Sequence, residues 1–127
     1  MQNNVTDTAL IDAFKAGKSS HSLALFDHLL NICGSIGGTR LYPTKTMIGI
    51  GKGDKATVWI TQIGKNFVHI VLPFSQAYTD NLCFQKIAQV PGQLQYNHHL
   101  RIFNNADLNE EIRHFLRLAL DTTPASG

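Results

Sequence analysis

The residues most capable of chemistry in this sequence lie in one short stretch, residues 96–103, which reads YNHHLRIF. It contains two adjacent histidines, His98 and His99, followed by Arg101. Histidine changes charge near neutral pH and serves as a general base, a metal ligand or a hydrogen-bond partner. A neighbouring arginine supplies a permanent charge that can hold an anion. The stretch therefore raises the hypotheses of a metal site, an acid–base site and a binding surface.

The order of side chains in this stretch indicates a β-strand, because alternate residues of a strand point to the same face of a sheet. His98 then shares a face with Leu100 and Ile102, which predicts that it points toward the core. His99 and Arg101 share the opposite face. Adjacent histidines in a strand diverge, and no metal-ligand spacing supplies further donors, so we predict no metal. We expect His98 to lie at the sheet edge or to donate to a backbone carbonyl, with His99 and Arg101 exposed.

Other candidate residues join this site if the fold brings them to the same face. Lys45 begins a predicted strand, and Arg40 lies five residues before it. Convergence with His99 and Arg101 would make a cationic pocket for a small anion, with Trp59 or Tyr42 as its wall. The alternative is a set of ordinary exposed cations. The candidate ligand-binding residues are Arg40, Lys45, Trp59, His98, His99 and Arg101.

Recognisable catalytic motifs are absent elsewhere in the sequence. The segment 49–53, GIGKG, lacks the spacing of a phosphate loop and precedes no helix, so it is expected to form a turn between strands. Neither G-x-S-x-G nor H-E-x-x-H occurs. We therefore predict no catalytic residues and no cofactor.

The elements that must position these residues follow from periodicity and capping. Apolar residues at helical spacing, with caps at Thr6–Asp7 and Ser19–Ser20, predict two N-terminal helices that end at Gly17 and Gly37. A closing helix is expected to open at Asp107 and to end before Thr122. Strands rich in branched and aromatic residues are predicted at 39–42, 45–50, 56–63, 66–74, within 82–90, and at 96–103.

A block of strands flanked by helices predicts an α+β fold. We expect an antiparallel sheet of four to six strands packed against the N-terminal and C-terminal helices, with the other face wet or used for contact. Alternation assigns Ile48 and Ile50 to one face, and places Trp59, Thr61 and Ile63 together on one face of their strand.

Length and composition set the remaining bounds. The 127 residues predict a single domain, residues 1–127, with flexible ends at 1–5 and 122–127. The net charge of +2 is too mild to favour nucleic acid, although it does not eliminate it. Charged residues make up only 16%, so self-association as a homodimer is plausible.

The cellular setting is inferred from the N-terminus and the cysteines. No signal peptide and no membrane-spanning stretch are visible, which makes the cytoplasm the expected compartment. Cys33 and Cys83 stand in apolar surroundings typical of buried thiols, and their pairing is left open.

The closing segment HHLRIFNNADLNEEIRHFLRLAL resembles a small bacterial domain-of-unknown-function family, number fifty-six fifty-five. Its members pair a strand of the His-His-Leu-Arg type with a polar turn and a helix. The helix matches at Leu108, Glu111, Ile112, Arg113, Phe115 and Leu116, and the earlier segments GKS at 17–19 and TKTMIGI at 44–50 are similar in outline. The resemblance implies an accessory module without established catalysis, because members occur fused to other domains, nuclease-like ones included. It points to Lys45, His98, His99 and Arg101 as site positions.

These inferences favour a non-catalytic binding or accessory module for a small anionic ligand or a protein partner. Two alternatives remain: a nucleic-acid-associated module, and an enzyme that uses a histidine as general base.

Overall fold

The computed structural model describes residues 5–121. Flexible ends were expected at 1–5 and 122–127. Residues 1–4 and 122–127 lie outside the described residues, and residue 5 begins the first helix. The helices are α1 (Val5–Lys15), α2 (Ser20–Ile36), a short 3-10 helix η1 (Asn105–Asp107) and α3 (Glu110–Asp121). The strands are β1 (Thr39–Pro43), β2 (Ile48–Lys52), β3 (Val58–Ile63), β4 (Val68–Phe74), β5 (Lys86–Gln89) and β6 (Tyr96–Ile102).

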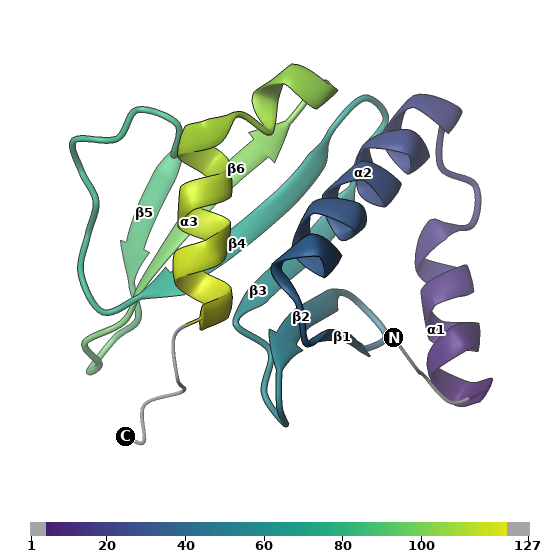
Figure 1. Cartoon of the computed structure of the whole chain (residues 1–127), viewed down its shortest axis with the longest axis horizontal. Helices are drawn as coiled ribbons and strands as arrows, with labels where there is room; N and C mark the ends of the chain where they lie inside the picture. The colour runs from purple at the N-terminus through teal and green to yellow at the C-terminus, as the bar shows by residue number, and fades with distance from the viewer. Residues whose placement is uncertain (1–4, 122–127) are drawn as a thin grey trace.

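The strands form one six-stranded sheet in the order β1-β2-β3-β4-β6-β5, and every neighbouring pair is antiparallel (Figure 1). This arrangement confirms the α+β fold and the antiparallel sheet predicted from the sequence. The histidine stretch forms β6, which lies between β4 and the edge strand β5. The site-bearing strand is therefore held on both sides.

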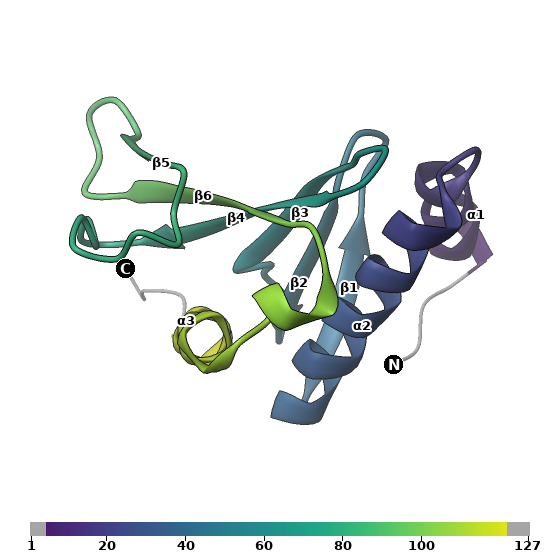
Figure 2. The same cartoon turned by 90° about the horizontal axis from the view of Figure 1, so that it is seen from above.

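Helices α2 and α3 pack against the same face of the sheet, while α1 lies beside α2 near the edge strand β1 (Figure 2). The core fills the space between this inner face and the two helices. It includes Phe26 and Leu29 of α2, Leu116 of α3, and Ile48 and Ile70 of the sheet, all nearly inaccessible to solvent. Within the described residues, no helix covers the opposite, outer face.

Helix α2 begins and ends where its sequence signals predict. The Ser19 side chain accepts a hydrogen bond from the Ser22 amide at 3.1 Å, which satisfies one of the free amides of the first turn. At the other end Gly37 has φ of 95°, a conformation that glycine adopts without steric cost.

The closing helix begins three residues later than the sequence indicated, at Glu110 rather than Asp107. Asp107 instead ends η1, where its carboxylate accepts hydrogen bonds from the amides of Phe103 and Asn104. Asn109 caps α3 through a 3.0 Å bond from the Ile112 amide. An aspartate is as favourable in such a turn as at a helix cap, so sequence did not separate the two.

A bulge in β3 corrects the predicted faces of that strand. The register with β4 shifts between Ile60 and Gln62, so that Thr61 is the additional residue. A bulge reverses the alternation beyond it. As a result Ile63 is buried in the core rather than sharing the face of Trp59 and Thr61.

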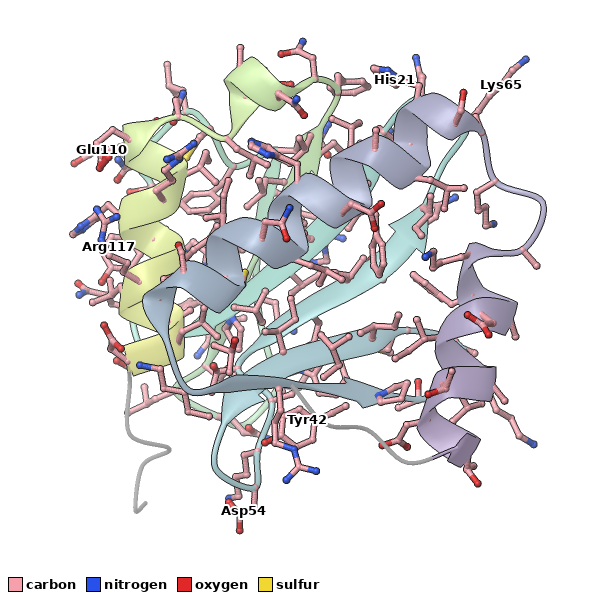
Figure 3. The ribbon with its side chains drawn as sticks, turned by 45° about the vertical axis from the view of Figure 1, so that its right-hand side comes forward. His21, Tyr42, Asp54, Lys65, Glu110 and Arg117 are labelled. Atoms are coloured by element: carbon pink, nitrogen blue, oxygen red, sulfur yellow. The ribbon has the colours of Figure 1, made fainter. Side chains whose placement is uncertain are left out.

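Polar contacts join the helices and turns at the periphery, where Figure 3 labels several of the residues. Glu110 and Arg117 form an ion pair of 3.1 Å on the exposed side of α3. His21 at the start of α2 bonds to the Phe103 carbonyl at 2.6 Å, and the Tyr42 hydroxyl donates to the carbonyl of Gly53. The ion pair lies within α3, whereas the other two contacts connect the end of β6 to α2 and β1 to the β2–β3 turn.

The two cysteines are free thiols, which answers the question of their pairing. Burial raises the pKa of Cys33 to about 12. Burial and the neighbouring Glu111 carboxylate raise the pKa of Cys83 to about 11. Both thiols are therefore protonated and unreactive near neutral pH.

Among the described residues, none of the helices combines the length and apolar character needed to cross a membrane.

Candidate functional site

His98 points into the core, as the alternation of β6 predicted. Its side chain is fully buried, with 0% exposure. The ring packs among aromatic side chains, with centroids 4.8 Å from Phe84, 5.1 Å from Phe74 and 5.5 Å from Tyr78. Burial in apolar surroundings is the main factor that lowers the pKa of His98.

Both ring nitrogens of His98 bond to backbone groups. The amide of Tyr78 donates to Nε2 at 3.0 Å, and Nδ1 lies 2.8 Å from the carbonyl of Tyr96. An amide can only donate, so Nε2 accepts and the hydrogen of the neutral ring is on Nδ1. His98 therefore pins the β4–β5 connection to β6 and has no nitrogen left for a ligand. The bond to backbone was predicted, whereas the alternative place at the sheet edge was wrong.

His99 lies on the outer face and forms a pair with His69 of β4. The distance from His69 Nε2 to His99 Nδ1 is 3.0 Å, and the rings meet edge to face with centroids 5.3 Å apart. Arg101 extends this contact, because its Nε lies 3.4 Å from His69 Nδ1. His69 and Arg101 are direct partners across β4 and β6, which explains why the three side chains meet.

The electrostatic surroundings keep this histidine pair neutral. Partial burial lowers the pKa of His69 most strongly, and the charges of His99 and Arg101 lower it further. Burial likewise lowers the pKa of His99, with contributions from Lys86 and His98. Burial first, and the nearby cations second, disfavour an additional proton, so the neutral form of both rings predominates near pH 7.

A shallow groove of about 450 Å³ opens on the outer face beside the pair. We call it the outer groove. Its apolar lining comes from Met47, Trp59, Val71 and Pro73, and its polar lining from Thr44, Thr61, Gln95, Asn97 and His99. Within the described part of the chain, no lysine, arginine, aspartate or glutamate lines it.

The outer groove is built across three neighbouring strands. Trp59 of β3 pairs with Val71 of β4, which in turn pairs with His99 of β6. The three side chains therefore form one row, with Val71 as the floor between an indole and an imidazole. Thr61, the extra residue of the bulge, adds a hydroxyl to the lining of the groove beside this row.

Trp59 owes its position to a glycine on the next strand. A Cβ atom at Gly49 would lie 2.9 Å from the indole ring and 2.5 Å from the Cβ of Ala56. These distances are shorter than real contacts, so the ring occupies the space that only glycine leaves open. An aromatic ring lying over a strand glycine shields its backbone and is itself held in place.

Only part of the predicted cationic pocket comes together. Trp59 and His99 line the outer groove. Arg101 does not line it, but contacts His69, which in turn contacts His99. Arg40 lies on the edge strand β1, stacked over Tyr42 at 5.3 Å, and Lys45 is exposed in the β1–β2 turn. Neither lines the outer groove: Thr44 of the same turn does, but the Lys45 side chain does not, and strands β2, β3 and β4 lie between Arg40 and β6.

His69 was not among the site residues predicted from the sequence. Its signal was its place on β4, since outward residues of paired strands become neighbours. To use that signal one must know that β4 pairs with β6 and not with β5, the next strand along the chain. Val71 and Asn97 were missed for the same reason.

The structure offers the histidine pair no further metal ligands. Across residues 5–121, no group of three or more His, Cys, Asp or Glu side chains could hold a metal ion. The pair itself is flanked by the cations Arg101 and Lys86, which disfavour a metal ion electrostatically. What the site can do is donate or accept hydrogen bonds beside an apolar surface.

Comparison with known proteins gives one positive result. The model of the family described as "Domain of unknown function (DUF5655)" matches residues 11–123, which is most of the chain. No curated protein and no solved structure matches the chain.

Proposed function

The chain belongs to the family of the domain of unknown function DUF5655, as its closing segment predicted, and we propose that it is a non-catalytic binding module. The outer groove is its ligand site. The ligand is a small molecule with an apolar body, which packs on Trp59 and Val71, and with one polar group, which bonds to His99.

One observation carries this proposal: a concave, largely apolar surface of about 450 Å³ has a neutral imidazole and a few amides and hydroxyls in its lining. Small-molecule sites typically have volumes of about 300–1,000 Å³, mostly apolar walls and a few polar groups that fix orientation. A purely solvated surface would instead carry charged side chains, and none of the described Lys, Arg, Asp or Glu residues lines the groove itself.

The anionic ligand expected from the sequence is compatible with this proposal if its carboxylate lies at His99. A carboxylate bonded to His99 would lie close to the chain of contacts from Arg101 through His69 to His99, so the guanidinium would act on it at short range. The rest of the ligand would contact apolar side chains. We therefore propose a small amphipathic acid or its neutral carbonyl counterpart, rather than an inorganic anion.

The histidine pair favours one second candidate, a general base at His99. Its lowered pKa leaves the ring neutral at pH 7, as a base requires. A base also needs an unprotonated nitrogen facing its substrate. The hydrogen position on His99 separates the two functions: a hydrogen on Nε2 makes the ring a donor toward the outer groove, whereas a base requires an Nε2 without hydrogen.

Trp59 allows a direct test of binding, because it is the only tryptophan of the sequence and lines the outer groove. We would titrate its fluorescence with cyclohexanecarboxylate and with cyclohexanone, and a parallel titration of free tryptophan would correct for the weak carbonyl absorption and the collisional quenching of the ketone. Saturable changes in the millimolar range or below are expected, since ligands of this size gain at most about 1.5 kcal/mol per heavy atom.

A steric plug provides the matched comparison. Thr61→Phe would fill the outer groove and abolish the saturable change, while Thr6→Phe makes the same replacement at an exposed position on α1 and should leave it intact. Equal binding by Thr61→Phe and the wild-type protein would disprove the outer groove as the site.

A further inference from the structure

We infer that Arg101 determines ligand selection by fixing a hydrogen on Nε2 of His99, so that the outer groove accepts ligands that present a carbonyl or carboxylate oxygen. This inference rests on the proposed function. Arg101 acts through His69 and is thus a positioning residue, while His99 makes the contact.

The first step is the contact of Arg101 Nε with His69 Nδ1 at 3.4 Å. A guanidinium group has only donors and remains charged at all ordinary pH values. Nδ1 of His69 must therefore accept, and the hydrogen of the neutral His69 ring is on Nε2.

The hydrogen on Nε2 of His69 then determines which nitrogen of His99 accepts. Nε2–H of His69 lies 3.0 Å from Nδ1 of His99, which must therefore accept. The hydrogen of the neutral His99 ring is then on its Nε2. The opposite arrangement, with His99 donating, would place a hydrogen on Nδ1 of His69, directed at the Nε–H of Arg101. Two donors would face each other, so Arg101 selects one of two otherwise similar hydrogen-bonded states.

Arg101 is held in position by an aromatic ring although it is exposed. Its guanidinium carbon lies 4.5 Å from the centroid of Phe67, a distance typical of cation–π contact. Phe67 in turn packs against Gly64, where an added Cβ would lie 2.3 Å from the ring, and against Phe103 at 5.9 Å. A glycine thus seats the ring that supports Arg101, just as Gly49 seats Trp59.

The groups that surround the pair all favour this neutral, directed state. On β6 the neighbour is Arg101, on β5 Lys86 is opposite His99, and on β3 the uncharged Gln62 is opposite His69. No carboxylate of the described residues contacts either ring. Nothing therefore stabilises a doubly protonated ring, which would have no nitrogen free to accept.

A fixed hydrogen has a direct consequence for ligands. Among the described residues, Nε2 of His99 has no hydrogen-bond partner, so its N–H is available to a molecule in the outer groove. A carbonyl or carboxylate oxygen satisfies this donor. An isosteric group without an acceptor leaves it unsatisfied once water is displaced, which weakens binding.

The test combines a ligand-free measurement with a binding ratio. Long-range ¹H–¹⁵N correlation spectra at pH 7.5 identify which nitrogen of His69 and His99 carries the hydrogen. Separate titrations compare cyclohexanone with methylenecyclohexane, which has the same shape and no oxygen, and cyclohexanecarboxylate distinguishes a charged acceptor from a neutral one. The variants are Arg101→Leu and, as control, Arg40→Leu, which removes an arginine stacked on Tyr42 of the same face.

In the wild-type protein and in Arg40→Leu, we expect the hydrogen on Nε2 of His99. In Arg101→Leu both hydrogen positions should be populated about equally, so only about half of the molecules would offer the Nε2 donor, and the ratio of cyclohexanone to methylenecyclohexane affinity should fall about twofold. A loss confined to the carboxylate would show a charge effect alone and overturn the inference, as would a wild-type hydrogen on Nδ1 of His99. Failure of every probe to bind the wild-type protein would instead refute the proposed function.

Discussion

His98 and His99 are adjacent in the chain and share a residue type, yet they belong to different regions of the molecule. His98 is fully buried on the inner face, and both of its nitrogens bond to backbone. His99 lies on the outer face, bonds to another histidine and lines the outer groove. The pleat of one strand separates the two environments by a single residue.

The difference shows how a neighbouring group decides what an imidazole does. The Tyr78 amide makes Nε2 of His98 an acceptor, whereas Arg101, acting through His69, makes Nε2 of His99 a donor. The two rings therefore carry opposite tautomers with the same net charge. One tautomer serves the architecture of the β4–β5 connection, and the other is available for recognition.

Truncation of the two histidines should break the comparison most strongly. His98→Ala would leave the Tyr78 amide and the Tyr96 carbonyl without their buried partner and would open a cavity among aromatic rings. We expect a loss of about 3–5 kcal/mol in the free energy of unfolding. His99→Ala should cost about 1 kcal/mol or less, since its ring is only partly buried. Urea denaturation measures both, and equal losses would contradict the division of roles.

Glycine substitutions extend the comparison from the two histidines to the two faces. Gly49→Val would force Trp59 away from its seat, with an expected loss of about 1–3 kcal/mol and a shift in tryptophan emission. Gly34→Ala at an exposed position of helix α2 is the control for a glycine with free space, because nothing lies within 4 Å of its added Cβ. It should raise stability by about 0.5–1 kcal/mol and leave the emission unchanged. An unaltered spectrum in Gly49→Val would contradict the seating of Trp59.

The pH dependence of stability should sharpen the contrast. Burial lowers the pKa of His98, so below the ordinary histidine pKa of about 6.5 the unfolded chain binds more protons than the folded protein. Stability is therefore highest above that pH and falls as the pH decreases. In the double variant His69→Gln/His99→Gln we still expect a loss of about 1 kcal/mol between pH 7.5 and 5.5. Denaturation at both pH values tests this, and a flat profile would show that His98 does not titrate in this way.

The smallest effect should come from removing the aromatic ring that supports Arg101. Phe67→Leu keeps an apolar side chain beside Gly64 but removes the aromatic face under the guanidinium. We expect a loss of about 0.5–1 kcal/mol in unfolding free energy. The Arg101 Nε–H signal should also exchange faster with solvent, whereas the His98 Nδ1–H signal should keep its exchange rate. A change at His98 would mean that the two faces are coupled.

Much of this architecture was predictable from local patterns. The alternation in YNHHLRIF correctly sent His98 inward and His99 outward, because the period of a strand is a property of the backbone. The caps and glycines of α2 were equally local signals. The bulge at Thr61 escaped prediction because it depends on pairing with β4, and the start of α3 at Glu110 escaped because Asp107 suits a turn as well as a helix cap.

The candidate site was only partly predictable, for a different physical reason. Trp59, His99 and Arg101 were named from their residue types, but Arg40 and Lys45 were grouped with them without knowledge of strand order. His69 was the reverse case, since an isolated histidine in an apolar strand carries no sign of its partner. Contacts between strands depend on register, which requires the whole sheet.

By itself, the sequence determined the periods, the caps and the face on which each residue of β6 lies, because these follow from backbone geometry over a few residues. Tertiary structure alone decided which outward residues meet: β4 beside β6, His69 against His99, and the indole of Trp59 over Gly49. Such contacts join residues far apart in the chain. They form only when the burial of the inner face has set the order and register of the strands.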